Sequence, residues 1–258
     1  MSFTRLFQMI NLRIKRIKNS LIKSLSITPA PNVSKKALVV IILAALCLVC
    51  IKYLTGFDQL ISFLEIIHLD SLANYFTELR NNTNDKQLFD LIYWTTCRVF
   101  FYLIIPVIAI KFFIKKRISD FGWKLSDDLN KDLKIFIAFF CFMFPLVFWV
   151  STQESFLIKY PFYRPSSADQ IYPNLLIWEL FYFLQFVSLE FFFRGFVVHG
   201  LKEEIGDYSV LVMIIPYCMI HFQKPFLETI GAILAGVILG YLSLRKNSIL
   251  TGIALHFS

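Results

Sequence analysis

The sequence predicts an all-α fold: a polytopic membrane helix bundle with about six full spans, a short C-terminal apolar helix and an N-terminal basic amphipathic segment. Two observations predict it. Of the 258 residues, 57% are hydrophobic and only 17% are charged, whereas charged residues make up about 25% of an average soluble domain. In addition, several apolar stretches approach the roughly 20 residues that a helix needs to cross a bilayer.

Residues 1–36 are predicted to form a basic cytoplasmic N-terminal segment and a linker. The first part interleaves Lys and Arg with Leu, Ile and Phe, a pattern typical of an amphipathic helix on a membrane surface. A disordered basic tail is the alternative. Two prolines and the pair Lys35-Lys36 then lead into a helical membrane domain, which we expect at 37–258.

Six apolar stretches fit spanning helices in chain order. Their approximate bounds are 37–55, 88–112, 133–151, 174–200, 208–224 and 226–244. Between the first two, 56–87 mixes apolar residues with carboxylates, which favours a surface-lying helix and a polar loop. The last apolar stretch, 248–257, is too short to cross a bilayer. Either the chain ends inside the bundle or the sequence is truncated.

The net charge of +8 would suggest a nucleic-acid partner in a soluble protein. Here the Lys and Arg residues cluster at the ends of apolar stretches, where they set membrane orientation. The lipid bilayer is therefore the predicted partner, and no nucleic acid is expected. The basic N-terminus, the 111–124 loop and Arg245-Lys246 should face the cytoplasm. This arrangement predicts a multi-pass protein of the cell (inner) membrane with a cytoplasmic N-terminus.

Three ionisable residues lie at similar depth in neighbouring apolar stretches. An unpaired ionisable side chain in the bilayer costs roughly 2.5–3.5 kcal/mol or more, so such residues indicate function by default. Counted from the predicted ends of their stretches, Glu190, His221 and His256 all lie roughly 15–18 Å from the cytoplasmic boundary at a rise of 1.5 Å per residue. The sequence therefore predicts that these three side chains share one site.

Other polar residues of these stretches are sorted by helical spacing. Arg194 follows Glu190 by four residues, on the same helix face, and could pair with it. Glu179 precedes Glu190 by three turns and could line the same cavity. His199 falls on the opposite face, near the membrane interface. Glu228, near the start of the sixth stretch, could cap that helix or join the site.

Glutamate with two histidines suits two hydrolytic mechanisms. The three candidates Glu190, His221 and His256 could ligate a divalent metal such as zinc and leave one position for water. Alternatively, the carboxylate could act as a general base while the histidines donate to a developing oxyanion. The chain lacks the HExxH spacing, so a metal is not required by the pattern. Transport and structural polar packing are the non-enzymatic alternatives.

Three motifs follow one another in the last third of the chain: Glu190-Phe-Phe-Phe-Arg194-Gly-Phe, Tyr217-Cys-Met-Ile-His221 and His256. Their order and spacing resemble the CAAX protease and bacteriocin-processing (CPBP, or Abi) family of intramembrane proteases, which includes type II CAAX prenyl endopeptidases. The resemblance covers about 174–258 as a catalytic core. It implies an endopeptidase that hydrolyses a peptide bond of a membrane-associated protein or peptide.

The resemblance also implies roles for single residues. Glu190 would activate water and Arg194 would orient Glu190. His221 would assist as acid, base or ligand, and His256 would stabilise the oxyanion or ligate. The family has been described both as metalloproteases and as glutamate-dependent proteases, so the metal question stays open.

Two departures from the family pattern define the alternatives. The first motif usually has paired glutamates, of which the first acts on water, but that position is Leu189 here. Either Glu190 takes over, or Glu228 or Glu179 compensates, or the protein is a catalytically inactive relative that serves as a membrane scaffold or immunity factor. The third motif normally continues four positions past its histidine, and this sequence ends two residues after His256.

Overall fold

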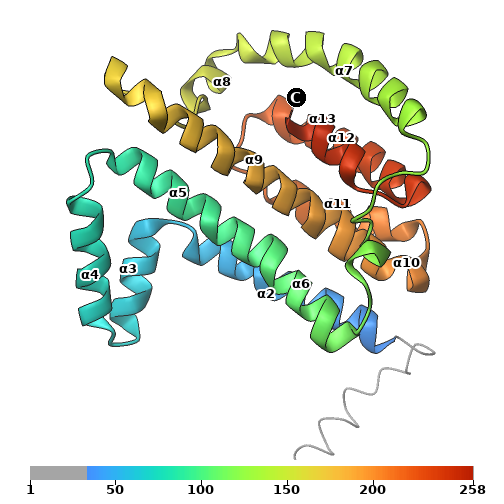
Figure 1. Ribbon diagram of the computed structural model, residues 1–258, viewed down its shortest axis with the longest axis horizontal. Coiled ribbons are helices and arrows are strands. Elements are labelled where there is room, and N and C mark those ends of the chain that lie inside the picture. Colours follow the sequence, from blue (N-terminus) through green and yellow to red (C-terminus); the bar gives the residue numbers. More distant parts are fainter. Residues whose placement is uncertain (1–33, 258) are drawn as a thin grey trace, which may run out of the picture. The chain divides into compact units, whose positions relative to one another are not determined.

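Every regular element in the part of the chain that the computed structural model describes, residues 34–257, is a helix (Figure 1). The all-α prediction is therefore confirmed. Residues from Lys35 onward form one compact unit. The basic amphipathic helix predicted near the N-terminus lies outside the described residues.

Five helices are long and apolar enough to cross a membrane, and each coincides with a predicted span. They are α2 (Lys35–Leu54), Lys86–Ile114, α7 (Leu129–Ser151), Ile171–Ile205 and α12 (Phe226–Lys246). The predicted span 208–224 is instead the shorter helix α11 (Tyr208–Met219). Its 12 residues cover only about 18 Å, less than the hydrocarbon thickness. The chain leaves the helix at Met219 and turns through His221 before Pro225 starts α12.

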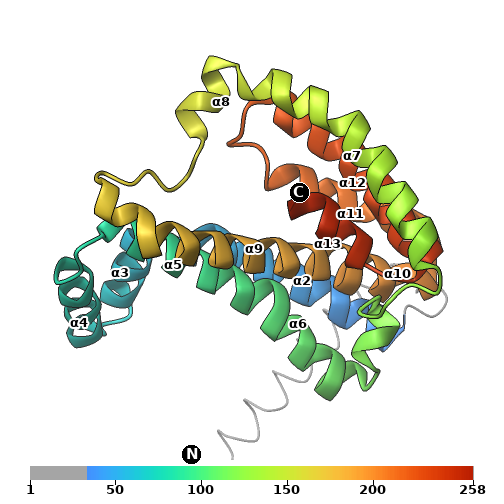
Figure 2. The same cartoon turned by 45° about the horizontal axis from the view of Figure 1, so that its top comes forward.

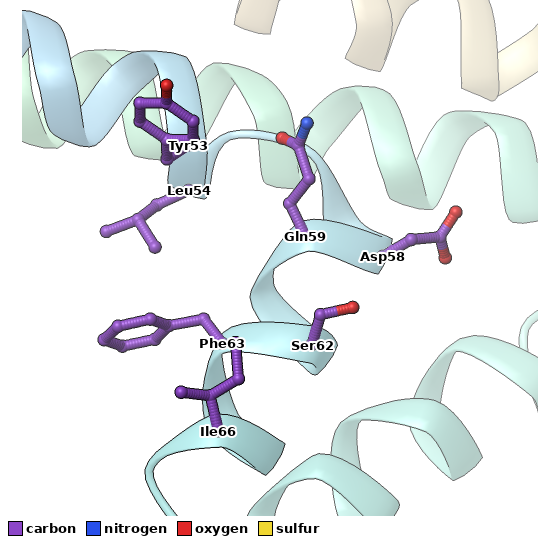
Figure 3. A pocket seen from close by; sticks show the side chains of 7 residues that line it. All are labelled: Tyr53, Leu54, Asp58, Gln59, Ser62, Phe63 and Ile66. Carbon is purple, nitrogen blue, oxygen red and sulfur yellow. The ribbon is translucent and has the colours of Figure 1, made fainter.

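The remaining elements are short. They are α3 (Phe57–Ile66), α4 (Asp70–Asn81), η3 (Ile118–Phe121), α8 (Glu154–Lys159), η4 (Ala168–Gln170) and α13 (Leu250–Phe257). The pair α3 and α4 occupies the region in which a surface helix and a polar loop are predicted. An apolar pocket lies where α2 turns into α3, as Figure 3 shows, and its lining residues come from those two helices alone.

Two of the spanning helices contain wide, π-helical turns. The first divides into α5 (Lys86–Val99), η1 (Phe100–Ile104), α6 (Ile105–Ile108) and η2 (Ala109–Ile114). The second divides into η5 (Ile171–Leu175), α9 (Leu176–Glu190), η6 (Phe191–His199) and α10 (Gly200–Ile205). Pro106 accounts for a break in the first, because proline lacks an N–H donor and crowds the carbonyl four residues earlier. The wide turn η6 begins directly after Glu190, and such turns frequently mark functional sites.

The helix that carries Glu190 lies in the interior of the bundle. Figure 1 shows α9 beside α5, and α9 also contacts α13, while η6 packs against α11 and α12. Four phenylalanines of η6 are fully buried: Phe191, Phe192, Phe193 and Phe196. At Gly236 and Gly240 of α12, a Cβ would lie 2.6 Å from side chains of α11. These glycines therefore allow the close approach of α11 and α12.

In contrast, α7 packs loosely against the bundle. None of its spanning window is buried inside the protein, and Figure 2 shows it arching over α12 and α13. Its one buried residue is Asp132, which pairs with Lys246 at 2.7 Å. Most of the α7 surface is therefore available to lipid.

A carboxylate at the start of α5 ties the connection 152–170 to the bundle. Asp85 caps α5 by accepting a hydrogen bond from Leu88 N at 2.9 Å. Its other oxygen accepts from Tyr163 Oη at 2.6 Å and from Asn174 Nδ2 at 3.1 Å. Burial acts to raise the pKa of Asp85, but the hydrogen bonds outweigh it, so the pKa lies below the ordinary 3.8.

Replacing Asp85 with alanine is expected to loosen this connection. A carboxyl group with a depressed pKa stabilises the fold above its unfolded pKa, and that stabilisation is lost as the pH falls through the folded pKa. At neutral pH, Asp85→Ala should therefore lower the free energy of unfolding by about 1–2 kcal/mol and speed amide hydrogen exchange in 152–170. Well below pH 3.8 the wild-type protein should exchange like the variant. If wild-type protein and Asp85→Ala exchange amide hydrogens in 152–170 at equal rates at neutral pH, Asp85 does not have this role.

Candidate active site

Glu190 and Arg194 form a fully buried ion pair at the junction of α9 and η6. Both side chains have no exposed surface, and Arg194 Nη1 lies 3.0 Å from Glu190 Oε1. The guanidinium carbon also lies 4.2 Å from the centre of the Tyr217 ring. Breaking a buried pair by removing one partner typically costs 3–5 kcal/mol, because the other charge remains buried. The pair that the helical spacing predicts is therefore present, and each member needs the other.

His256 joins this pair from α13. Its Nδ1 lies 2.8 Å from Glu190 Oε1. A carboxylate oxygen accepts, so Nδ1 is the donor, and Nε2 of the neutral ring keeps its lone pair. The His256 side chain is 23% exposed whereas that of Glu190 is 0% exposed. Of the two hydrogen-bonded residues Glu190 and His256, His256 is therefore the one that reaches the surface.

The second oxygen of Glu190 is enclosed by α13. Oε2 is buried and accepts no hydrogen bond from any residue in the described part of the chain. A Cβ placed on Gly252 would lie 2.8 Å from this oxygen. Gly252 stands four residues before His256, one helical turn away, so the spacing could have indicated that both face Glu190. Sequence reasoning missed this glycine, which leaves room for the carboxylate.

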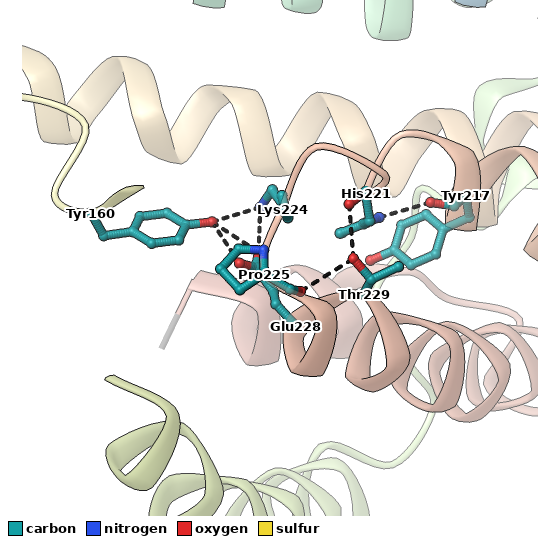
Figure 4. Close-up of polar contacts among 7 residues, drawn as sticks. All are labelled: Tyr160, Tyr217, His221, Lys224, Pro225, Glu228 and Thr229. Atoms are coloured by element: carbon teal, nitrogen blue, oxygen red, sulfur yellow. Dashed lines mark hydrogen bonds and ion pairs between the residues drawn. The ribbon is translucent and has the colours of Figure 1, made fainter. Parts of the chain in front are cut away.

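His221 contacts the ring of Tyr217, as Arg194 does, but in the described part of the chain it forms no hydrogen bond with Glu190 or His256. Figure 4 shows its Nδ1 directed at the Tyr217 carbonyl, at 2.8 Å, and its own carbonyl accepting from Thr229 Oγ1, also at 2.8 Å. Because a carbonyl only accepts, Nδ1 donates and Nε2 of the neutral ring carries the lone pair. The imidazole packs on the Tyr217 ring at 4.9 Å.

The two possible compensating glutamates lie elsewhere. Glu228 pairs with Lys224 and accepts a hydrogen bond from Tyr160 Oη at 2.8 Å (Figure 4). Burial lowers the pKa of Lys224 despite the opposing effect of the Glu228 carboxylate. Glu228 therefore ties the start of α12 to the 152–170 connection. Glu179 is exposed, and the structure does not bring it to Glu190.

The interpretation of His199 as an interfacial side chain needs correction. The structure buries it completely, with Nδ1 3.0 Å from Lys202 Nζ. The prediction counted nine residues at the pitch of an α-helix. The turns between Glu190 and His199 are π-helical, so the wider turn changes the angle per residue and rotates His199 toward the protein.

The three proposed metal ligands do not fit a metal site. Within residues 34–257, no three His, Cys, Asp or Glu side chains lie close enough together to hold a metal ion. Glu190 Oε1 and His256 Nδ1 are directed at each other, and His221 Nδ1 is directed at the Tyr217 carbonyl. These three atoms therefore serve hydrogen bonds between protein groups.

Comparison with known proteins agrees with the motif resemblance. The model of the family described as type II CAAX prenyl endopeptidase Rce1-like matches residues 172–258. We refer to the matched segment, the last third of the chain, as the Rce1-like domain. The match begins two residues before the predicted core and contains all the proposed catalytic residues. No curated protein and no solved structure shows significant similarity to the chain.

The Rce1-like domain supports two general statements. Its family consists of membrane-embedded proteases, which agrees with the predicted class of enzyme. Together with five helices that are able to span a membrane, it supports a multi-pass membrane protein. In this chain the Rce1-like domain comprises the elements from η5 to α13, which include both wide turns of the Ile171–Ile205 helix and the Glu190–His256 contact.

Proposed function

We propose that the protein is an intramembrane endopeptidase that hydrolyses a peptide bond of a membrane-associated protein or peptide. The observation that supports it most directly is the hydrogen bond between Glu190 and His256 at 2.8 Å. A carboxylate that accepts from Nδ1 fixes the tautomer of the imidazole and stabilises the imidazolium, and this arrangement serves as a general base in peptidases.

Within this pair, His256 is the proposed proton acceptor. Its side chain is partly exposed, whereas Glu190 is enclosed. His256 Nε2 removes a proton from water as the water oxygen attacks the peptide carbonyl carbon. When the C–N bond of the tetrahedral intermediate breaks, the imidazolium returns that proton to the leaving nitrogen. The products are a carboxylic acid and an amine, so the step consumes one water molecule.

Two further residues complete the proposed site. Arg194 holds the Glu190 carboxylate ionised and in place by its buried charge. His221 keeps its Nε2 lone pair, because Nδ1 is directed at the Tyr217 carbonyl, and Nε2 is the proposed acceptor of a hydrogen bond from the attacking water. Its position is fixed by the Tyr217 carbonyl at one end and by Thr229 at the other.

The proposed setting is the cell membrane, with the N-terminus in the cytoplasm. The basic residues of 111–124 and the pair Arg245-Lys246 lie at helix ends that should face the cytoplasm under the positive-inside rule. Alternation then places the 56–87 and 152–173 regions on the other side. Partners are the lipid bilayer and a membrane-associated substrate.

Incubation of the purified protein with a library of membrane-anchored peptides tests this function. We expect cleaved products, identified by mass spectrometry, from wild-type protein in detergent. The variant His221→Ala should cleave about 10²-fold more slowly, as is typical when a positioned hydrogen-bonding group at the reacting centre is lost. Wild-type protein that is folded and cleaves no member of the library would count against the peptidase.

The second candidate function is an inactive family member that acts as a membrane scaffold or immunity factor. Leu189, in the position of the usual first glutamate, favours it, since this side chain is 4% exposed and packs in the apolar core. This alternative would be supported if the folded wild-type protein cleaves no peptide but binds a membrane protein partner, and if the Glu190→Gln variant still binds that partner.

A further inference from the structure

Arg98 carries a positive charge near the middle of the 29-residue helix Lys86–Ile114. Among the described residues, no carboxylate forms an ion pair with its guanidinium, and its buried Nε finds no hydrogen-bond acceptor. The guanidinium carbon lies 4.1 Å from the centre of the Trp94 ring. Such a contact contributes about 0.5–2 kcal/mol, less than the roughly 2.5–3.5 kcal/mol that arginine costs at the centre of a spanning helix. The charge therefore lacks an adequate partner in the protein.

Aromatic rings in contact lead from Arg98 toward the proposed active site. The Trp94 ring beside Arg98 contacts Phe162 at 5.9 Å, and Phe162 contacts Tyr182 of α9, also at 5.9 Å. Along α9, the Tyr182 ring contacts Phe186 at 4.7 Å, and Phe186 contacts the His256 imidazole at 4.7 Å. A continuous row of rings thus connects the surroundings of Arg98 with the proposed base.

The charges around Arg98 favour an anion. Lys224, the cation beside Tyr160, is paired with Glu228, which also accepts a hydrogen bond from Tyr160. Arg98 has no carboxylate partner among the described residues, so its charge is not balanced by an ion pair. At membrane depth the low dielectric strengthens its attraction for a negative group far beyond that in water.

We propose that Arg98 binds a carboxylate of the peptide substrate and thereby determines which peptides enter the proposed active site. The proposal rests on the peptidase function above. A guanidinium offers two parallel N–H donors that match a carboxylate, which makes such pairs both strong and selective in geometry. The terminal carboxylate is the anion that a free peptide end supplies. Arg98 acts on specificity and touches no reacting bond.

Binding of a probe peptide, measured without cleavage, tests this proposal. The background variant is Glu190→Gln in detergent. The probe is a fluorescein-labelled apolar decapeptide with an N-terminal palmitoyl chain, made once as the free acid and once as the C-terminal amide. We expect the free acid to bind about 10- to 100-fold more tightly, as for a charge-assisted hydrogen-bonded pair.

Variants of Arg98 on the Glu190→Gln background show whether Arg98 causes the difference in affinity between the two probe forms. Arg98→Gln should bind both probe forms with the affinity of the amide, and Arg98→Lys should recover part of the difference. The matched control is Arg117→Gln, since the Arg117 side chain is 84% exposed and pairs with Asp120 outside the spanning helices. This control variant should keep the full difference in affinity between the free acid and the amide. Thermal unfolding of each variant shows whether it is folded.

Three outcomes would overturn the proposal. The first is equal binding of the two probe forms, including no measurable binding of either. The second is an unchanged difference in folded Arg98→Gln. The third is loss of the difference when phosphatidylglycerol is added to the micelles, which would assign Arg98 to a lipid phosphate. Failure of the peptidase function would give a different result. The wild-type protein would then cleave no peptide, while the free-acid probe would still bind more tightly than the amide.

Discussion

Replacing Glu190 with glutamine, or His256 with alanine, is expected to lower kcat/KM for a cleaved peptide by about 10²–10⁴-fold. Each change removes one half of the same base. The amide of Glu190→Gln no longer stabilises an imidazolium, and His256→Ala removes the proton acceptor itself. Because the two residues act as a unit, the double variant should be no slower than His256→Ala alone. Steady-state cleavage of one membrane-anchored peptide measures all three.

The matched control for this cycle is Glu204→Gln, an exposed glutamate of α10 that receives the same substitution. It should leave kcat/KM unchanged. Glu190→Gln also removes the partner of buried Arg194, so thermal unfolding must accompany its kinetics. Full activity in His256→Ala together with loss in Glu190→Gln would show that Glu190 acts on water directly. Full activity in both would end the assignment of this pair as the base.

Hydropathy predicts most of the fold because a spanning segment must satisfy its backbone hydrogen bonds internally, which leaves little choice besides a long apolar helix. It overestimated only the span 208–224. Ile220 and Phe222 continue the apolar pattern past Met219, so the stretch is predicted as one helix although α11 ends there. The turn instead depends on Pro225 and on contacts such as that of Thr229 with the His221 carbonyl.

The candidate site was predictable where helical spacing alone decides proximity. The spacing of four residues places Arg194 next to Glu190, and the depth estimate brings His256 to the same level. The position of His221 depends on how the Tyr217 ring packs between helices, which no spacing encodes. For the same reason, the lack of a counter-ion at Arg98 is visible only when the side chains of neighbouring helices are in place.

A single methyl group on α13 is expected to inactivate the enzyme without unfolding it. The Cβ of Gly252→Ala would lie 2.8 Å from Glu190 Oε2, closer than such atoms approach. The carboxylate is the end of a side chain, so it moves aside at little cost in stability. Its hydrogen bond to His256 then shifts, and misplacing a catalytic group by about 1 Å can cost about 10²-fold in rate. We therefore expect kcat/KM to fall by about 10²-fold while the melting temperature stays near that of the wild type.

Gly231→Ala in α12 is the matched control, because a Cβ at Gly231 meets no atom within 4 Å. This variant should retain full kcat/KM and gain about 0.4–1 kcal/mol in free energy of unfolding, since alanine restricts the unfolded chain more than glycine does. Comparing kcat/KM of the two variants separates a general effect of replacing a helical glycine with alanine from the effect of displacing the Glu190 carboxylate. If Gly252→Ala cleaves as fast as Gly231→Ala, the placement of Glu190 against α13 has no role in catalysis, and the proposed base must be sought elsewhere in the Rce1-like domain.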